Sequence, residues 1–237
     1  MKILSFDSTA KVASVAVTEG ERALLQYSID NGLTQSELLL PMAEAALKAL
    51  RIDFSDIGAY AVTVGPGSFT GVRIGVSLVK GLAFGRGVPC VPVSTLEALA
   101  ENLCSLSGII VPCMDARRSQ VYTAIFSSDK ENITRLCEDR AISISELGEK
   151  LREYDGTPIY LVGDGYDIVY KALMELGLKN LADTPPLLRL QNAASVGRVA
   201  KRKLESGDYT TDENLSPIYL RMPQAERERL EKEKDRK

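Results

Sequence analysis

Glycine and hydroxyl side chains are concentrated in one stretch, residues 65–75, which reads Gly-Pro-Gly-Ser-Phe-Thr-Gly-Val-Arg-Ile-Gly. It follows an apolar, strand-like run and leads into residues with helical spacing. Gly65 and Gly67 flank a proline and can adopt the positive φ, or allow the close backbone approach, that other residues resist. Ser68 or Thr70 can cap the following helix. Such a turn either offers backbone N–H groups to an anion such as phosphate or packs against another backbone segment.

Two aspartates end strand-like apolar runs: Asp7 follows residues 2–6, and Asp115 follows residues 109–114. Each is followed by a polar turn and a second strand-like segment. ATPases and kinases that use such carboxylates also place glycines beside them, because a Cβ would block the approach of a phosphate. The turns after Asp7 and Asp115 contain no glycine. We therefore expect a degenerate nucleotide site rather than an active one.

A third turn belongs to the same expectation. Gly163 and Gly165 flank Asp164 between a strand-like and a helix-like run, where a nucleoside could pack or where the glycines only maintain the turn. The sequence allows weak nucleotide binding but predicts no tightly bound cofactor, no metal ion and no catalytic residue. The candidate degenerate nucleotide site consists of Asp7, Gly65, Gly67, Ser68, Asp115, Gly163 and Gly165.

The composition excludes several classes of enzyme and partner. The 237 residues contain no histidine, which rules out Ser-His-Asp hydrolysis, Cys-His proteolysis and histidine-ligated zinc. The net charge of −3 argues against a dominant nucleic-acid surface. The four cysteines lack Cys-x-x-Cys spacing and are typical of reduced thiols. With neither a signal peptide nor an apolar run of membrane-spanning length, we expect a cytoplasmic protein that does not contact a membrane.

Apolar residues cover a wide arc of the predicted helix 36–50, in two neighbouring stripes. A surface helix needs only one stripe, so we expect burial on two sides, against its own sheet and against a partner protein. The predicted helix 72–84 adds small residues that permit another helix to approach closely. The alternative is that both helices are internal. The predicted partner interface consists of Leu38, Leu39, Met42, Ala45, Ala46, Ala49, Gly75, Leu78, Val79 and Leu82.

Strand-like and helix-like segments alternate along the chain, which is typical of an α/β fold. The repeated order of strand, aspartate, turn and strand predicts two related lobes with mixed sheets. We place the N-terminal lobe at residues 1–104 and the C-terminal lobe at residues 105–211. The C-terminal segment 212–237 is expected to complete the N-terminal lobe.

Several motifs together resemble the bacterial TsaB family, formerly called YeaZ. The glycine-rich segment 65–75 closely resembles the signature of that family. Agreement extends along almost the whole chain, through residues 3–9, 36–41 and 115–118, and through Tyr219-Leu220-Arg221 followed by Ala225-Glu226. The chain departs from the family at Gln35, where members often carry histidine.

The resemblance implies the two-lobed, ribonuclease-H-like fold of actin, sugar kinases and heat-shock ATPases. It also implies a non-catalytic subunit whose first-lobe helices pair with a TsaD-like paralogue, the enzyme that forms threonylcarbamoyladenosine in tRNA beside the anticodon. A small TsaE-like ATPase joins the complex, the chain alone forms homodimers, and tRNA is reached only through the complex. The competing class is an ATP-dependent enzyme of the same fold, an ATPase or kinase. A peptidase is weaker still, because without histidine only a Ser-Lys pair could act.

Overall fold

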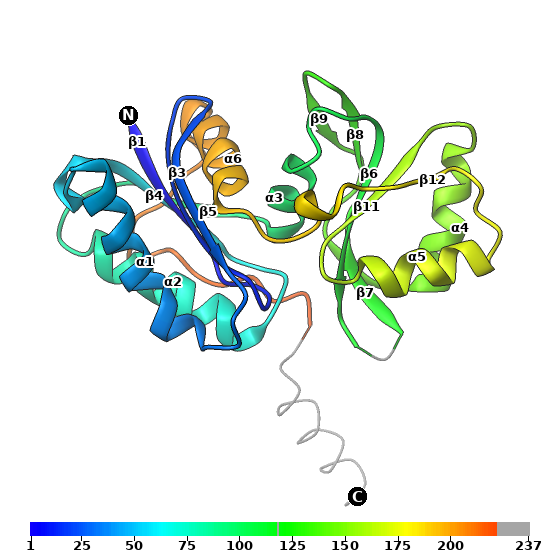
Figure 1. Cartoon of the computed structure of the whole chain (residues 1–237), viewed down its shortest axis with the longest axis horizontal. Coiled ribbons are helices and arrows are strands. Elements are labelled where there is room, and N and C mark those ends of the chain that lie inside the picture. The colour runs from blue at the N-terminus through cyan, green and yellow to red at the C-terminus, as the bar shows by residue number, and fades with distance from the viewer. Residues whose placement is uncertain (118, 222–237) are drawn as a thin grey trace, which may run out of the picture.

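The computed structural model describes residues 1–117 and 119–221, which form two lobes lying side by side (Figure 1). The first lobe contains a five-stranded sheet with the strand order β3-β2-β1-β4-β5. β2 runs antiparallel to both of its neighbours, β1 and β3, whereas β1, β4 and β5 run parallel to one another. The strands are β1 (Lys2–Asp7), β2 (Ala13–Glu19), β3 (Arg22–Ile29), β4 (Ile57–Thr63) and β5 (Cys90–Val93).

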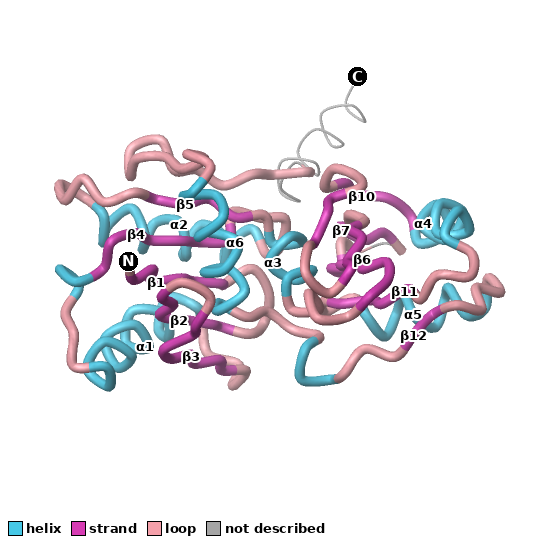
Figure 2. The backbone as a smooth tube through the Cα atoms, turned by 90° about the horizontal axis from the view of Figure 1, so that it is seen from above, coloured by secondary structure: helices cyan, strands magenta, loops and turns pink. Residues whose placement is uncertain are grey.

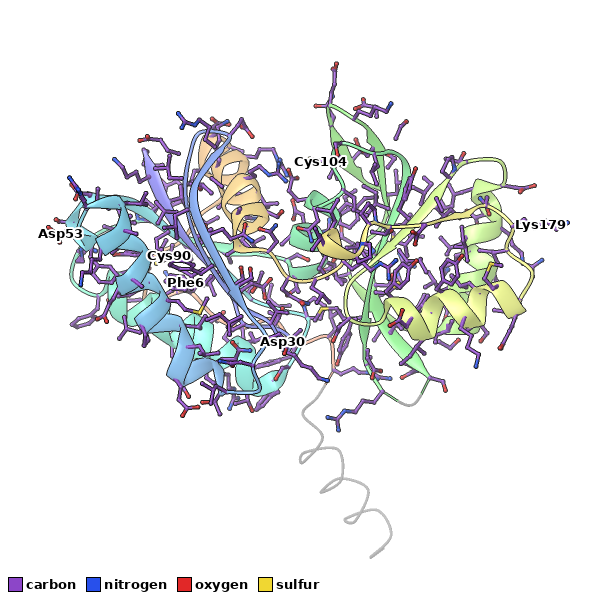
Figure 3. All side chains as sticks on the ribbon, viewed as in Figure 1. Phe6, Asp30, Asp53, Cys90, Cys104 and Lys179 are labelled. Atoms are coloured by element: carbon purple, nitrogen blue, oxygen red, sulfur yellow. The ribbon has the colours of Figure 1, made fainter. Side chains whose placement is uncertain are left out.

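Helices cover both faces of this sheet (Figure 1). Along β1, Leu4 and Phe6 face the helices α1 (Gln35–Leu50) and α2 (Phe69–Ala83), as expected for the alternation of a strand. Ile3 faces the other way and packs with α6 (Ala193–Glu205). In Figure 3, Phe6 and Cys90 are labelled within the first lobe.

The second lobe has a sheet with the order β10-β7-β6-β11-β12, in which β8 also pairs with β6, and β9 with β8. The helices α4 (Ile144–Leu151) and α5 (Tyr166–Glu175) pack against one face of it through a separate apolar core. The strands are β6 (Ser107–Asp115), β7 (Gln120–Thr123), β8 (Phe126–Asp129), β9 (Ile133–Arg135), β10 (Arg140–Ser143), β11 (Ile159–Val162) and β12 (Leu181–Ala182).

The helix α3 (Thr95–Glu101) lies between the lobes, as the view from above shows (Figure 2). It packs against α6 of the first lobe and against β6 of the second. Leu96, Leu99 and Leu103 meet apolar residues of the second sheet. The described residues also contain three short 3-10 turns: η1 (Phe54–Asp56), η2 (Arg152–Tyr154) and η3 (Pro186–Leu188).

The position of α6 corrects the predicted lobe boundary. The sequence assigned residues 105–211 to the C-terminal lobe, but α6 packs on β1, β2 and β5 of the first sheet. Glu101 of α3 is buried against Arg198 and Arg202 of α6, which fastens the helix there. The chain therefore returns to the first lobe before residue 193. The following segment also lies on the first lobe until its end reaches the second lobe at Arg221. Residues 222–237 of the predicted completing segment lie outside the described residues.

The predicted fold class is confirmed. In both lobes a central strand that ends in an aspartate, β1 or β6, pairs antiparallel with the strand after it and parallel with a later one. This is an α/β architecture of two related lobes with mixed sheets. Within the described residues, no helix is long and apolar enough to cross a membrane.

Candidate functional site

A cleft of about 580 Å³ lies between the lobes, where the predicted degenerate nucleotide site should be. The first lobe contributes the turn 9–11 and residues 66–70, which include the glycine turn and the first residues of α2. The second lobe contributes residues 114–117 and Asp164, and the C-terminal segment 218–221 closes another side. The structure therefore brings together turns that are far apart in the sequence.

The glycine turn at the start of α2 packs against the protein's own backbone. A Cβ on Gly67 would lie 2.5 Å from the carbonyl oxygen of Thr9, and one on Gly65 would lie 2.5 Å from that of Ile218. Ser68 donates its N–H to the same Thr9 oxygen at 2.7 Å, while its hydroxyl caps the helix at Gly71. Of the two interpretations of this turn, the contacts support packing, because the chain itself occupies the space and the Ser68 donor.

Two glycines within α2, Gly71 and Gly75, also pack against the turn that follows β1. A Cβ on Gly71 would collide with the carbonyl of Ser8, and one on Gly75 with the Ser8 hydroxyl. The Ser8 hydroxyl donates to the Gly71 carbonyl at 2.8 Å. The predicted site omitted Gly71, although its spacing in the motif was the available signal. Gly75, which was assigned to the partner interface, is instead buried against the turn after β1.

The glycine turn of the second lobe is filled in the same way. Cβ atoms on Gly163 and Gly165 would crowd the carbonyl of Cys113. Gly165 donates its N–H to that carbonyl at 3.0 Å, and Gly163 donates to Arg189 at 2.6 Å. These glycines hold the turn against β6, so their backbone is not free to approach a nucleoside.

Asp7 is fully buried at the end of β1. Its Oδ1 accepts hydrogen bonds from the N–H of Thr9 at 3.0 Å and from the Thr9 hydroxyl at 2.7 Å. Its Oδ2 has no partner among the described residues, and neither has the hydroxyl of Thr63 on the adjacent strand. Burial raises the pKa of Asp7 from 3.8 to about 6, although the bonds from Thr9 act in the opposite direction.

The other two aspartates lie closer to solvent. Burial, with the nearby charge of Asp115, raises the pKa of Asp164. Asp115 is exposed, and its Oδ1 accepts the N–H of Arg117 at 2.7 Å. Across residues 1–117 and 119–221, no three Asp, Glu, Cys or His side chains are grouped to hold a metal ion. The sequence missed the positive charge that Lys11, Arg117 and Arg221 bring to the cleft, since isolated basic residues in turns give no pattern.

Gln35, where the chain departs from the family motif, connects α1 to this cleft. Its Nε2 donates to the carbonyl of Ala10 at 2.9 Å and to that of Lys11 at 3.2 Å. An amide N–H thus positions the turn after β1, which needs a hydrogen-bond donor but no titratable group.

The predicted partner interface is corrected in part. The structure buries six of its ten residues within the first lobe: Leu38, Leu39, Met42, Ala46, Gly75 and Val79. Leu78 and Leu82 are half-buried, and Ala45 and Ala49 are exposed. The two stripes of α1 therefore face mainly its own sheet and α2, since both helices cover the same core.

An outward surface nevertheless remains on these two helices, and we call it the α1/α2 face. It carries several small and apolar side chains. Phe84, at the end of α2, is 79% exposed, although the sequence did not single it out. The face is formed by Pro41, Ala45, Ala49, Ile74, Ser77, Leu78, Gly81, Leu82 and Phe84.

The sequence of this chain is similar to those of known proteins. A family profile described as "TsaD: tRNA N6-adenosine threonylcarbamoyltransferase" matches residues 34–229. The chain is 30% identical to the tRNA threonylcarbamoyladenosine biosynthesis protein TsaB of Bacillus subtilis, over 99% of this chain and 100% of that protein. The chain belongs to the TsaB family. The TsaB protein of Escherichia coli is also 30% identical, over 93% of this chain and 95% of its own length.

Solved structures from Pseudomonas aeruginosa share the fold of this chain. YeaZ from Pseudomonas aeruginosa superposes with a TM-score of 0.74 at 23% identity, covering 92% of this chain and 99% of that chain. A second structure, an uncharacterized protein from Pseudomonas aeruginosa described as similar to the peptidase YEAZ, gives a TM-score of 0.76, also at 23% identity, over 93% and 99%. Both proteins therefore share the two-lobed fold of this chain.

Proposed function

We propose that this chain is a non-catalytic partner subunit of the TsaD-type enzyme that forms threonylcarbamoyladenosine in tRNA beside the anticodon. Its membership of the TsaB family supports a role in that modification. The observation that carries the partner role is the α1/α2 face: two adjacent helices present small and apolar side chains outward on a lobe whose core is already complete. Small residues allow a second pair of helices to approach closely.

The same face can serve two pairings. A TsaD-like paralogue would place its own helix pair on Ala45, Ala49 and Gly81, and in its absence a second copy of this chain would do so. A TsaE-like ATPase would join the assembled pair, and tRNA would be contacted only through the complex. The net charge of −3 fits a subunit that does not bind tRNA by itself.

Independent catalysis has little support. The glycine turns that would hold phosphate or nucleoside pack against Thr9, Ile218 and Cys113. The chain has no histidine to act as a base. These features favour a subunit over the ATPase, kinase or peptidase alternatives.

Substitution of one exposed alanine tests this proposal. Ala45→Glu should leave the fold intact and weaken pairing with the TsaD-like paralogue at least tenfold, because a desolvated, unpaired charge opposes docking. Ala23→Glu, on the exposed edge strand β3, is the matched control and should pair normally. Analytical ultracentrifugation of the mixed proteins, with circular dichroism of each variant, measures both. Normal pairing by a folded Ala45→Glu variant would disprove the assignment of this face.

A further inference from the structure

The segment that follows α6, residues 208–221, returns across the first lobe, and we call it the strap. Thr210 forms a two-bond bridge with Cys90 of the edge strand β5, at 2.9 and 2.8 Å. Leu215 is only 2% exposed and belongs to the first-lobe core. Ile218 donates its N–H to Val64 at 2.8 Å. The strap is therefore an ordered part of the lobe.

Two basic side chains of α2 hold the strap. Lys80 Nζ donates to the carbonyls of Glu213 and Leu215 at 2.9 and 3.1 Å. Arg73 Nε donates to the Tyr219 hydroxyl at 2.7 Å, and its guanidinium lies 3.9 Å from the centre of the Phe69 ring. Among the described residues, neither cation forms an ion pair. Their side chains serve the strap instead.

The strap ends by reaching the other lobe. Arg221 Nη1 donates to the carbonyl of Ala116 at 3.0 Å, in the turn that follows β6. Its neighbours Ile218, Tyr219 and Leu220 line the interlobe cleft. The strap is thus anchored on α2 at one end and bonded to the second lobe at the other.

The chain crosses between the lobes twice, and a hydrogen-bonding side chain at the end of α3 joins these two crossings. Asn102 at the end of α3 donates its Nδ2 to the carbonyls of Leu188 and Leu190, at 3.0 and 2.8 Å. This amide ties the first crossing, from α3 to β6, to the second, from η3 to α6. In Figure 1 the crossings lie beside α3, and the end of the strap passes below them. Ser94, the cap of α3, also donates to Asp139 of the second lobe at 2.5 Å.

We propose that the strap is a latch on the interlobe cleft. The crossings tied by Asn102 form the hinge, and the Arg221 hydrogen bond to Ala116 joins the lobes at the cleft. Rotation about the hinge separates Arg221 from Ala116, so that bond opposes opening. The motif Tyr219-Leu220-Arg221 thereby acquires a role: Tyr219 fixes the strap on α2, and Arg221 closes the cleft.

Arg221→Met tests the latch, because methionine keeps an apolar stem and removes every donor. Hydrogen exchange of the amides at residues 119–121 should become about tenfold faster, as expected for the loss of a charged hydrogen bond. Small-angle scattering should show a larger radius of gyration. Tyr219→Leu, which loses the bond from Arg73, should produce the same pair of changes.

The matched control is Arg152→Met. Arg152 also donates from its guanidinium to a carbonyl, that of Leu176 at 2.9 Å, but within the second lobe. The Arg152→Met variant should leave the hydrogen exchange of the amides at 119–121 and the radius of gyration unchanged. Unchanged exchange at 119–121 in Arg221→Met would overturn the latch. Equal acceleration in α6 and the turn would also overturn it, because that result indicates general destabilisation.

Discussion

At the scale of single residues, the buried carboxyl of Asp7 makes stability depend on pH. Its pKa is raised from 3.8 to about 6 in the folded protein. Its contribution to folding is therefore fully present below the unfolded pKa and is lost as pH rises through the folded one. The separation of the two pKa values corresponds to about 3 kcal/mol lost by pH 8.

Asp7→Asn should therefore stabilise the protein at pH 8 by up to about 3 kcal/mol and have little effect at pH 4. The amide keeps an acceptor for Thr9 and places its NH₂ where Asp7 Oδ2 faces Thr63. Urea unfolding of both proteins between pH 4 and 8 measures the difference. Asp30→Asn, an exposed aspartate labelled in Figure 3, is the control and should show no such trend. A stability difference that does not change with pH would contradict the assignment.

The sequence identified the unusual residues but not all of their partners. The glycine density of residues 65–75 and the positions of Asp7 and Asp115 were visible directly. The partners of Gly65 and Gly67, the carbonyls of Ile218 and Thr9, were not, because each belongs to a distant segment. A glycine pattern reports a close approach without saying whether a ligand or another backbone makes it.

At the scale of elements, alanine substitution should affect stability differently at the glycine before α2 and at a glycine within the helix. Gly67→Ala should destabilise the protein by more than about 2 kcal/mol, because φ is +158° and the new Cβ would meet the Thr9 carbonyl. Gly81 lies within α2 itself, and a Cβ added there would have nothing within 4 Å. Gly81→Ala should stabilise the protein by about 0.5–1 kcal/mol, since alanine is the better helix former. Thermal unfolding of the two variants measures both effects. Equal changes in stability would contradict the role assigned to Gly67.

The helices were predicted to within a few residues, but their orientation was not. The expected helix 36–50 is α1, and its two stripes are real. One stripe packs on the sheet, and the other contacts a helix of the same lobe, which periodicity cannot distinguish from a partner. The lobe assignment of α6 failed for a related reason: its apolar stripe shows that it is buried without specifying the sheet.

The burial of Met42 changes the expected effect of a charged substitution at this position. This side chain is 5% exposed within the first-lobe core, so Met42→Glu should unfold the lobe rather than only block pairing. Burial of an unpaired carboxylate costs several kcal/mol. Circular dichroism and gel filtration of this variant beside Ala45→Glu distinguish a core position from a surface one. A folded, monomeric Met42→Glu variant would mean that this side chain can turn outward.

At the scale of the whole molecule, the two lobes enclose a cleft, while the chain's own backbone packs into the glycine turns beside it. Addition of about 1 mM ATP with Mg²⁺ should therefore leave the unfolding temperature unchanged. If the nucleotide bound with a Kd of about 10 μM, that hundredfold excess would add about 2.7 kcal/mol. In a chain of this length the unfolding temperature would rise by roughly 5–10 °C. A rise of that size, dependent on magnesium and lost in Asp115→Asn, would show that the cleft still binds nucleotide and that the packed turns can open to admit it.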